Sequence, residues 1–241
     1  MVYNTLFGRY GGISDAGPTI PASLYLPFNV DFNDRSGNGH TGTGTGTAAL
    51  STDQSKFGGK SLKLDGNSDF VTYANSADFQ FGADDFTIEA YVYQENAAGS
   101  DPADRHPIVS RADAQDERSF HFGIVSSGGQ QRLQFSFTSD GSQATQYEFY
   151  GDVTVDNFHL VAVVRSGVDM LGFVNGTLLS SSVVGATSRI GSASIHVGTS
   201  DLEIGHRGLS NQFFDGFIDE VRIVKGTAVY TGNFTPPGAH G

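Results

Sequence analysis

Short runs of alternating apolar and polar residues, separated by clusters of Gly, Asn, Asp and Ser, fill the chain from Leu62 onward. The alternation is clearest in residues 86–92, 120–124 and 133–137. A period of two residues is typical of antiparallel strands that bury one face. We therefore expect an all-β fold with almost no helix.

Residues 159–164 and 170–174 are more continuously apolar and predict central strands. Asn175-Gly176 follows the second of them, and this dipeptide favours a tight hairpin. Strands of this length and spacing predict a sandwich or jelly roll of two antiparallel sheets. A chain of 241 residues is long enough to bury such a core as a single domain.

Two segments lie outside the strand pattern. Residues 1–22 show little periodicity, so we expect an N-terminal arm or linker ahead of a domain spanning residues 23–241. The arm could pack along the sandwich or dock onto a neighbouring subunit. The Gly-Thr alternation of residues 41–47 predicts a flexible loop or a weak edge strand.

The charge and the termini exclude several classes of partner. The net charge is −12 and the 14 Lys and Arg residues are scattered, so we expect no nucleic acid partner. The chain has no run of about 18 apolar residues, so we expect no membrane partner. Residues 1–10 lack a basic start followed by an apolar run, and we expect synthesis in a cytoplasm without a signal peptide. The absence of Cys excludes disulfides and thiolate chemistry.

Several motifs occur in the order found in one protein family. They are FGGKSLKLDG at 57–66, FTIEAYV at 86–92, FHLVAV at 158–163, FVNG at 173–176 and FIDEVRI at 217–223. On these motifs the chain resembles the laminin-G-like members of the concanavalin A-like lectin/glucanase superfamily from about Leu24 to Tyr230. The resemblance implies a concanavalin A-like jelly-roll sandwich of two antiparallel sheets. It is specific for fold only, since this fold carries lectins, glucanases and adhesion modules.

The last part of the sequence resembles one particular group of laminin-G-like domains. Residues 219–226 and 230–237 are similar to the ending of laminin-G-like domains in bacteriophage tail and virion proteins. This implies a virion structural or adhesion protein, such as a capsid decoration, tail or fibre component, assembled in the host cytoplasm. The arm at residues 1–22 would bind other virion proteins, and the domain would recognise a host-surface glycan. The alternative is a carbohydrate-binding lectin domain of a cellular or secreted glycan-processing system. Exposed strand edges would also allow a homo-oligomer.

We expect no enzyme activity. Glucanases of this fold use an E-x-D-x-x-E run, and here no Glu is followed two residues later by Asp. The chain also lacks a G-x-S-x-G nucleophile motif. Its dispersed histidines have no metal-ligand spacing, and we expect them in surface or turn positions; they include His106, His121, His159, His196 and His206.

Asp219 is the strongest candidate for a metal ligand. Alternation predicts that it shares the apolar face with Val221 and Ile223, where a carboxylate is costly unless it is paired or bound to a metal. The resemblance to glucanases implies one structural Ca²⁺, bound by Asp219 and by the backbone carbonyls of Pro27 and Gly59. Hard oxygen ligands of this kind suit calcium. The alternatives are that Asp219 caps backbone amides or pairs with an Arg.

If a sugar stacks on an aromatic ring of this protein, we expect the ring to be that of a tyrosine, because the chain has no Trp. Tyr91 and Tyr93 are predicted to point away from the core face of residues 86–92, and Tyr147 and Tyr150 belong to another predicted strand. A tyrosine-lined glycan surface is one interpretation of these four residues. The other is that they are ordinary exposed strand residues or fill a second layer.

Overall fold

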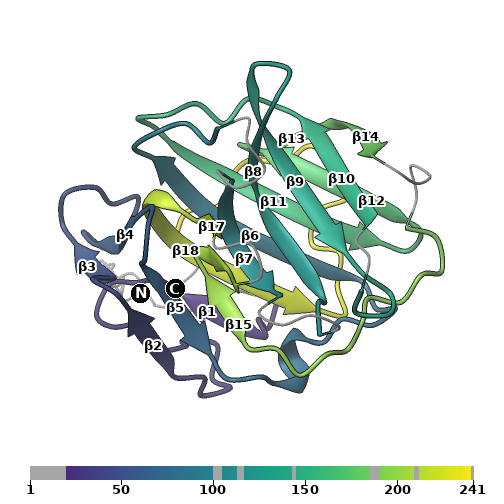
Figure 1. Cartoon of the computed structure of the whole chain (residues 1–241), viewed down its shortest axis with the longest axis horizontal. Coiled ribbons are helices and arrows are strands. Elements are labelled where there is room, and N and C mark those ends of the chain that lie inside the picture. The colour runs from purple at the N-terminus through teal and green to yellow at the C-terminus, as the bar shows by residue number, and fades with distance from the viewer. Residues whose placement is uncertain are drawn as a thin grey trace, which may run out of the picture.

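The computed structural model describes residues 20–99, 105–112, 117–142, 145–184, 190–208 and 212–239. These residues form two large antiparallel sheets packed face to face (Figure 1). The concanavalin A-like sandwich expected from the sequence is therefore confirmed. Most of the predicted arm, residues 1–19, lies outside the described residues.

The first sheet has the last long strand in its middle. Its order is β13 (Thr177–Leu178), β12 (Asp169–Val174), β11 (Phe158–Ser166), β6 (Phe86–Gln94), β18 (Asp215–Lys225), β4 (Ser61–Asp65) and β3 (Ala49–Ser51), and β1 (Leu24–Leu26) also pairs with β18. The predicted strands at residues 159–164, 170–174 and 217–223 are all present here.

The second sheet contains the other predicted strands. Its order is β14 (Ser180–Val184), β10 (Thr145–Tyr150), β9 (Gln130–Phe137), β8 (Phe120–Ser127), β7 (His106–Arg111), β15 (Leu202–Ile204), β5 (Phe70–Tyr73) and β2 (Gly42–Thr45). The Gly-Thr segment is the edge strand β2. A short ribbon pairs β16 (His206–Arg207) with β17 (Gln212–Phe213).

Helix is limited to one 3₁₀ turn, η1 (Ala77–Phe79), within the described part of the chain. No helix there has the length and apolar character needed to cross a membrane.

The core lies between the two sheets and is rich in aromatic rings. The alternation predicted which residues point inward: Phe86, Ile88, Ala90, Val92, Phe120, Phe122, Ile124, Leu133, Phe135 and Phe137 all belong to the core cluster. Phe81 and Phe86 stack with ring centroids 4.3 Å apart, which links a loop to β6. Each such buried side chain contributes about 1.5–3 kcal/mol of hydrophobic stabilisation.

The hairpin between β12 and β13 has the geometry that its dipeptide predicts. Asn175 and Gly176 adopt φ angles of +49° and +78°. Positive φ at both central residues defines a type I′ turn, whose twist matches that of the flanking strands.

Asp219 does not lie where the alternation predicts, because β18 contains a β-bulge. The register with β6 shifts between Asp219 and Arg222, and Glu220 adopts a φ of +52°. Asp219 consequently pairs with Tyr91 on the outer face of the first sheet, whereas Val221 and Ile223 remain in the core. The prediction that these three residues share a face is wrong, because the extra residue of the bulge reverses the alternation.

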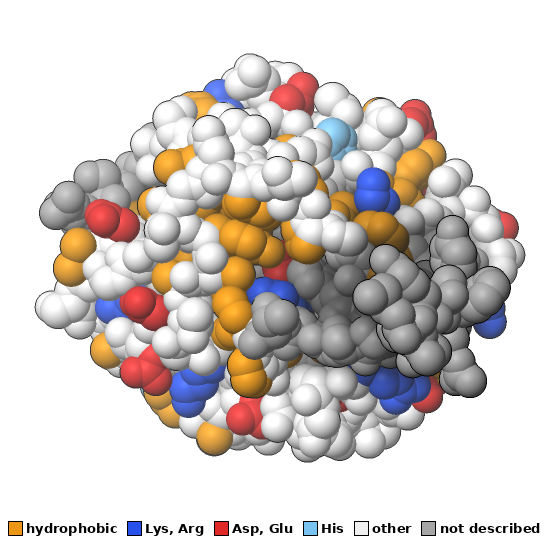
Figure 2. Space-filling model, turned by 180° about the vertical axis from the view of Figure 1, so that it is seen from behind, with side chains coloured by type: hydrophobic (Ala, Val, Ile, Leu, Met, Phe, Trp, Pro, Cys, Tyr) orange, Lys and Arg blue, Asp and Glu red, His pale blue; other side chains and the backbone are white. Residues whose placement is uncertain are grey.

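The segment after β18, residues 226–239, crosses the outer face of the first sheet. The Tyr230 and Phe234 rings stack with centroids 3.6 Å apart, and both pack edge-on against Phe173. The Tyr91 hydroxyl donates to the Pro237 carbonyl at 2.7 Å. Viewed from behind, the molecule shows hydrophobic side chains gathered across the middle of one face, with charged side chains scattered around it (Figure 2).

Candidate functional site

The four predicted tyrosines do not form one surface. Tyr91 lies on the outer face of the first sheet but is only 3% exposed, beneath Phe57 and the C-terminal segment. Tyr147 is on the second sheet and belongs to the core. Neither ring is available to stack on a sugar in this arrangement. Tyr147 instead matches the alternative that these residues fill an inner layer.

Tyr93 and Tyr150 are the accessible members of the set, and they lie on different sheets. Tyr93 contacts the rings of Phe158 and Phe217 on the first sheet. Tyr150 is 40% exposed at the end of β10 and has the Arg132 guanidinium 4.4 Å from its ring centroid. Only Tyr150 therefore adjoins the polar cluster described next.

Polar side chains occupy the outer face of the second sheet. We call this set the polar face; it comprises Arg105, Arg118, His121, Arg132, Gln134, Ser136, Glu148 and Arg207. His121, Gln134 and Ser136 alternate with the core residues of β8 and β9, yet they are only 1–2% exposed. Buried polar groups on the outside of a sandwich are unusual and need partners.

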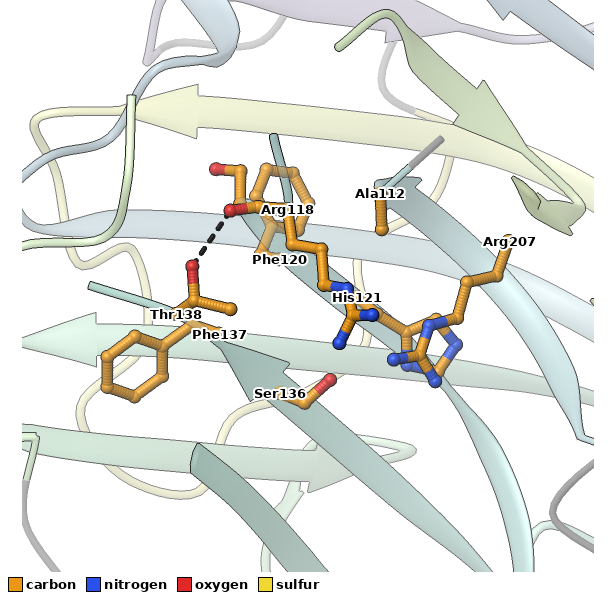
Figure 3. Close-up of a pocket in the computed structure, with 9 residues that line it drawn as sticks. Ala112, Arg118, Phe120, His121, Ser136, Phe137, Thr138 and Arg207 are labelled. Atoms are coloured by element: carbon orange, nitrogen blue, oxygen red, sulfur yellow. Dashed lines mark hydrogen bonds between the residues drawn. The ribbon is translucent and has the colours of Figure 1, made fainter. Parts of the chain in front are cut away.

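A small hollow with a cavity volume of about 10 Å³ opens within the polar face (Figure 3). The side chains of Arg118, His121, Ser136 and Arg207 line it and are directed toward the same space. Its wall is tied together by Thr138, whose hydroxyl donates to the Arg118 carbonyl at 2.8 Å. Three separate segments thus meet at this hollow: the approach to β8, the strand pair β8–β9, and β16.

Positive charge concentrates around the hollow. Burial, followed by the nearby charges of Arg105 and Arg118, lowers the pKa of Arg207 to about 10. Burial, followed by the charges of Arg207 and Arg105, holds the pKa of His121 well below its usual value. His121 is therefore neutral at pH 7. Neither of its ring nitrogens has a hydrogen-bond partner among the described residues.

The rim of the polar face is partly neutralised. Arg105 donates from Nη1 to Gln134 Oε1 at 2.7 Å, and Gln134 donates in turn to Gln146 Oε1 at 3.4 Å. Arg132 Nη1 lies 3.6 Å from Glu148 Oε2. These contacts hold the rim in place, and among the described residues no carboxylate lines the centre around His121.

The prediction that the histidines occupy surface or turn positions fails for three of them. His121 is buried in the polar face, and His106 is buried against Gln94, which contacts its Nδ1 at 2.9 Å. His206 is also buried, and its Nδ1 lies 3.1 Å from Glu203. The sequence held no signal for the burial of His121, since polar residues at the outward positions of β8 and β9 are also the normal pattern of a strand face open to water.

Asp219 is buried on the opposite sheet and caps a loop. Its Oδ2 accepts from the backbone N–H groups of Lys56 and Phe57 at 2.8 and 3.1 Å. Burial raises the pKa of Asp219 to about 7, against the lowering effect of these two hydrogen bonds. The amide-capping alternative is therefore seen directly.

Two buried oxygens near this loop have no hydrogen-bond partner among the described residues: Asp219 Oδ1 and Asn29 Oδ1. The Asn29 amide lies against Gly58, where an added side chain would overlap it, and it is two residues beyond Pro27. Carboxylate and amide oxygens are the ligand types that calcium takes, so the donor set fits. The described residues contain no group of three or more His, Cys, Asp or Glu side chains arranged for a metal. A calcium ion here would rely on backbone carbonyls, such as those of Pro27 and Gly59.

Comparison with known proteins supports the fold assignment. A laminin-G family model, described as the concanavalin A-like lectin/glucanases superfamily, matches residues 65–228. No curated protein matches the sequence.

Several solved structures with similar folds are described as binding domains. Domain 4 of AbnA, a GH43 extracellular arabinanase from Geobacillus stearothermophilus, was solved in complex with arabinotriose; it is 18% identical with a TM-score of 0.61, over 86% of this chain and 94% of that domain. The binding domain of Paraclostridial Mosquitocidal Protein 1 is 14% identical with a TM-score of 0.61, over 87% of this chain and 50% of that one. The binding domain of botulinum neurotoxin DC, in complex with SialylT, is 14% identical with a TM-score of 0.58, over 86% of this chain and 48% of that one. The chain thus spans about half the length of these toxin binding domains.

Proposed function

The chain belongs to the concanavalin A-like lectin/glucanase superfamily, and from that premise we propose that it binds carbohydrate through the polar face of its second sheet. The observation that carries the proposal is the hollow lined by His121, Arg118 and Arg207. Both ring nitrogens of His121 and the buried Nε atoms of the two arginines have no hydrogen-bond partner among the described residues. Sugar hydroxyls both donate and accept hydrogen bonds, and they would satisfy such atoms. The sugar complexes of the AbnA and neurotoxin domains support a carbohydrate ligand.

The mode of action that we propose is binding without catalysis. Glycoside hydrolysis by the common mechanisms requires two carboxylates on either side of the scissile bond. On the described part of this face, Glu148 is engaged by Arg132 and Glu203 is engaged by His206. The arginines around the hollow would instead hold a ligand in place.

Filling the hollow tests the binding site. We expect Ser136→Phe to place a ring in the space between Arg118 and His121 and to abolish binding of the purified chain on a glycan array. Thr177→Phe, an exposed position on the first sheet, is the matched control and should bind as the parent does. Melting temperatures of both variants establish that they are folded. Full binding by a folded Ser136→Phe variant would move the site away from the polar face.

The setting that we propose is a bacteriophage virion, assembled in the host cytoplasm, in which the domain contacts a host-surface glycan. Support comes from the ending of the chain, residues 219–226 and 230–237, which resembles virion-associated laminin-G-like domains. In the first sheet this ending forms most of β18 and the segment that covers it. The arm at residues 1–22 would attach the domain to other virion proteins.

A truncation separates this setting from the lectin alternative. We compare the full chain with a version starting at Ala22 by light scattering, alone and mixed with the producing particle. If only the full chain binds the particle, and the shorter version stays a folded monomer, attachment through the arm is supported. Identical free monomers would favour the lectin domain of a glycan-processing system. Self-association of the full chain would support a homo-oligomer.

One structural calcium ion completes the proposal. Asp219, with the carbonyls of Pro27 and Gly59, would hold it, and the unpartnered Asp219 Oδ1 and Asn29 Oδ1 support an ion in this region. Its contribution would be to link the chain that follows β1, the loop before β4, and β18.

A further inference from the structure

Arg118 and Arg207 face the hollow of the polar face without a negative partner. Neither forms an ion pair with any carboxylate in the described part of the chain, in contrast to Arg132, which lies 3.6 Å from Glu148, and Arg222, which lies 2.8 Å from Glu89. Arg105 adds a third guanidinium close enough to act on Arg207. Like charges have therefore been brought together on this face of a protein whose net charge is −12.

Such a cluster is unfavourable unless an anion joins it. Buried charges in proteins are normally paired, because desolvation penalises an isolated ion. The Nε atoms of Arg118 and Arg207 are buried and donate no hydrogen bond to any described residue, although Arg118 Nη1 donates to the Ser142 carbonyl at 3.1 Å. The lowered pKa of Arg207 has the same origin in burial and in its positive neighbours.

His121 provides a neutral group beside this charge. It is 1% exposed, and both ring nitrogens lack a partner among the described residues. A neutral imidazole has one donor and one acceptor nitrogen, which matches a sugar hydroxyl. The hollow thus combines an anion-binding part with a hydroxyl-binding part.

We infer that the ligand of the polar face is an acidic sugar whose carboxylate or sulfate group lies between Arg118 and Arg207, with a neighbouring hydroxyl on His121. This inference rests on the proposed carbohydrate-binding function and names the class of sugar. Guanidinium groups bind such oxyanions through parallel, charge-assisted N–H bonds. With a cavity volume of about 10 Å³, the hollow is far smaller than the roughly 300–1,000 Å³ of pockets that enclose whole small ligands. The charged group would therefore meet the guanidinium groups at the mouth of the hollow, with the rest of the glycan lying across the sheet.

The test is a glycan array printed with matched pairs, probed with the full-length chain. Each acidic glycan is paired with its neutral form: sialylated with desialylated, uronate with carboxyl-reduced, and sulfated with desulfated. We expect binding to acidic members only. Signal confined to carboxylated pairs identifies a carboxylate as the recognised group, and signal confined to sulfated pairs identifies a sulfate ester.

Two arginine variants connect this preference to the hollow. Arg118→Met and Arg207→Met should each weaken binding of the strongest acidic glycan by roughly tenfold to a hundredfold, the effect of losing a charge-assisted hydrogen bond. Arg207→Lys keeps the charge without the planar fork and should fall between the parent and Arg207→Met. Arg35→Met is the control, because Arg35 is exposed and pairs with Asp31 at 2.8 Å.

Thermal melts distinguish a ligand-binding role from a structural one. Removing one of several crowded positive charges should leave the melting temperature unchanged or higher, whereas a structural role would lower it. Equal binding of acidic and neutral partners, or unchanged affinity in both Met variants, would overturn the acidic-sugar inference and leave carbohydrate binding intact. Absence of binding to every glycan on the array would overturn the proposed function as well.

Discussion

Gly216 in β18 is a position where only glycine fits. Its φ is +132°, and a side chain there would overlap the backbone carbonyl of Tyr93 on the neighbouring strand. We expect Gly216→Ala to lower the free energy of unfolding by about 3 kcal/mol or more, because strain and a backbone clash combine. Denaturant unfolding measures the change.

Gly226 is the matched control for this substitution. It also has a positive φ, +82°, but open space surrounds the position of its missing side chain. Gly226→Ala should therefore cost only the conformational strain, about 1–2 kcal/mol. Equal losses in the two variants would show that the contact with Tyr93 contributes nothing.

Individual site residues were the hardest feature to predict from sequence. The sequence identified Asp219 as unusual, but it could not reveal the bulge at Glu220 that moves Asp219 to the outer face. Arg118 and Arg207 are far apart in the chain and meet only because β16 packs beside β7, the strand next to β8. Juxtapositions of this kind depend on long-range packing, which periodicity does not encode.

At the scale of elements, the C-terminal segment is held to the first sheet by buried tyrosines. Burial raises the pKa of Tyr91 to about 12, and the charges of Glu89, Glu220 and Asp219 add to the shift. Burial also raises the pKa of Tyr230, which stacks on Phe234. In the folded protein these phenols stay protonated at pH values where the unfolded chain ionises.

This difference predicts a loss of stability in alkali. A pKa raised by folding gives stability that is present below the ordinary phenol value of 10 and is lost as the pH rises toward 12. We expect the free energy of unfolding to fall across this window, with the phenolate absorbance of Tyr91 appearing only as the segment detaches. Tyr91→Phe should reduce the slope of the free energy of unfolding against pH by the amount that corresponds to one proton. An unchanged slope in Tyr91→Phe would contradict the assignment.

Strands were predicted far better than sites. Alternation located β6, β8 and β9 and their core-facing residues, because each of these strands buries one face and exposes the other to polar surroundings. The Asn175-Gly176 hairpin was predictable from two residues, since its conformation is local. The order of strands within each sheet was not predicted, because it depends on pairing between strands that are far apart in the chain.

At the scale of the whole molecule, calcium binding predicts that the melting temperature of the protein depends on the calcium concentration. An ion at about a hundredfold excess over its Kd stabilises the folded state by about 2.7 kcal/mol. We expect calcium to raise, and a chelator to lower, the melting temperature of the parent protein. Asp219→Asn should remove this response while keeping an oxygen to accept from the Lys56 and Phe57 amides.

Asp65→Asn provides the control for the calcium experiment. Asp65 is an exposed turn residue whose Oδ1 accepts from the amides of Asn67, Ser68 and Asp69, and Asn can retain that turn. The Asp65→Asn variant should respond to calcium as the parent does. If neither calcium nor the chelator changes the melting temperature of the parent protein, the protein has no structural calcium site.

The central position of β18 also governs how the chain is made. The strands that flank it, β6 and β4, are synthesised more than a hundred residues earlier. During synthesis the first sheet is therefore divided into two parts until residue 225 has left the ribosome. The edges of β6 and β4 that will pair with β18 have unpaired backbone N–H and C=O groups until then. Such edges are templates for pairing with other chains. Ribosomes stalled ahead of β18 should accordingly carry aggregation-prone, protease-sensitive chains, whereas release of β18 closes the sheet in one late step.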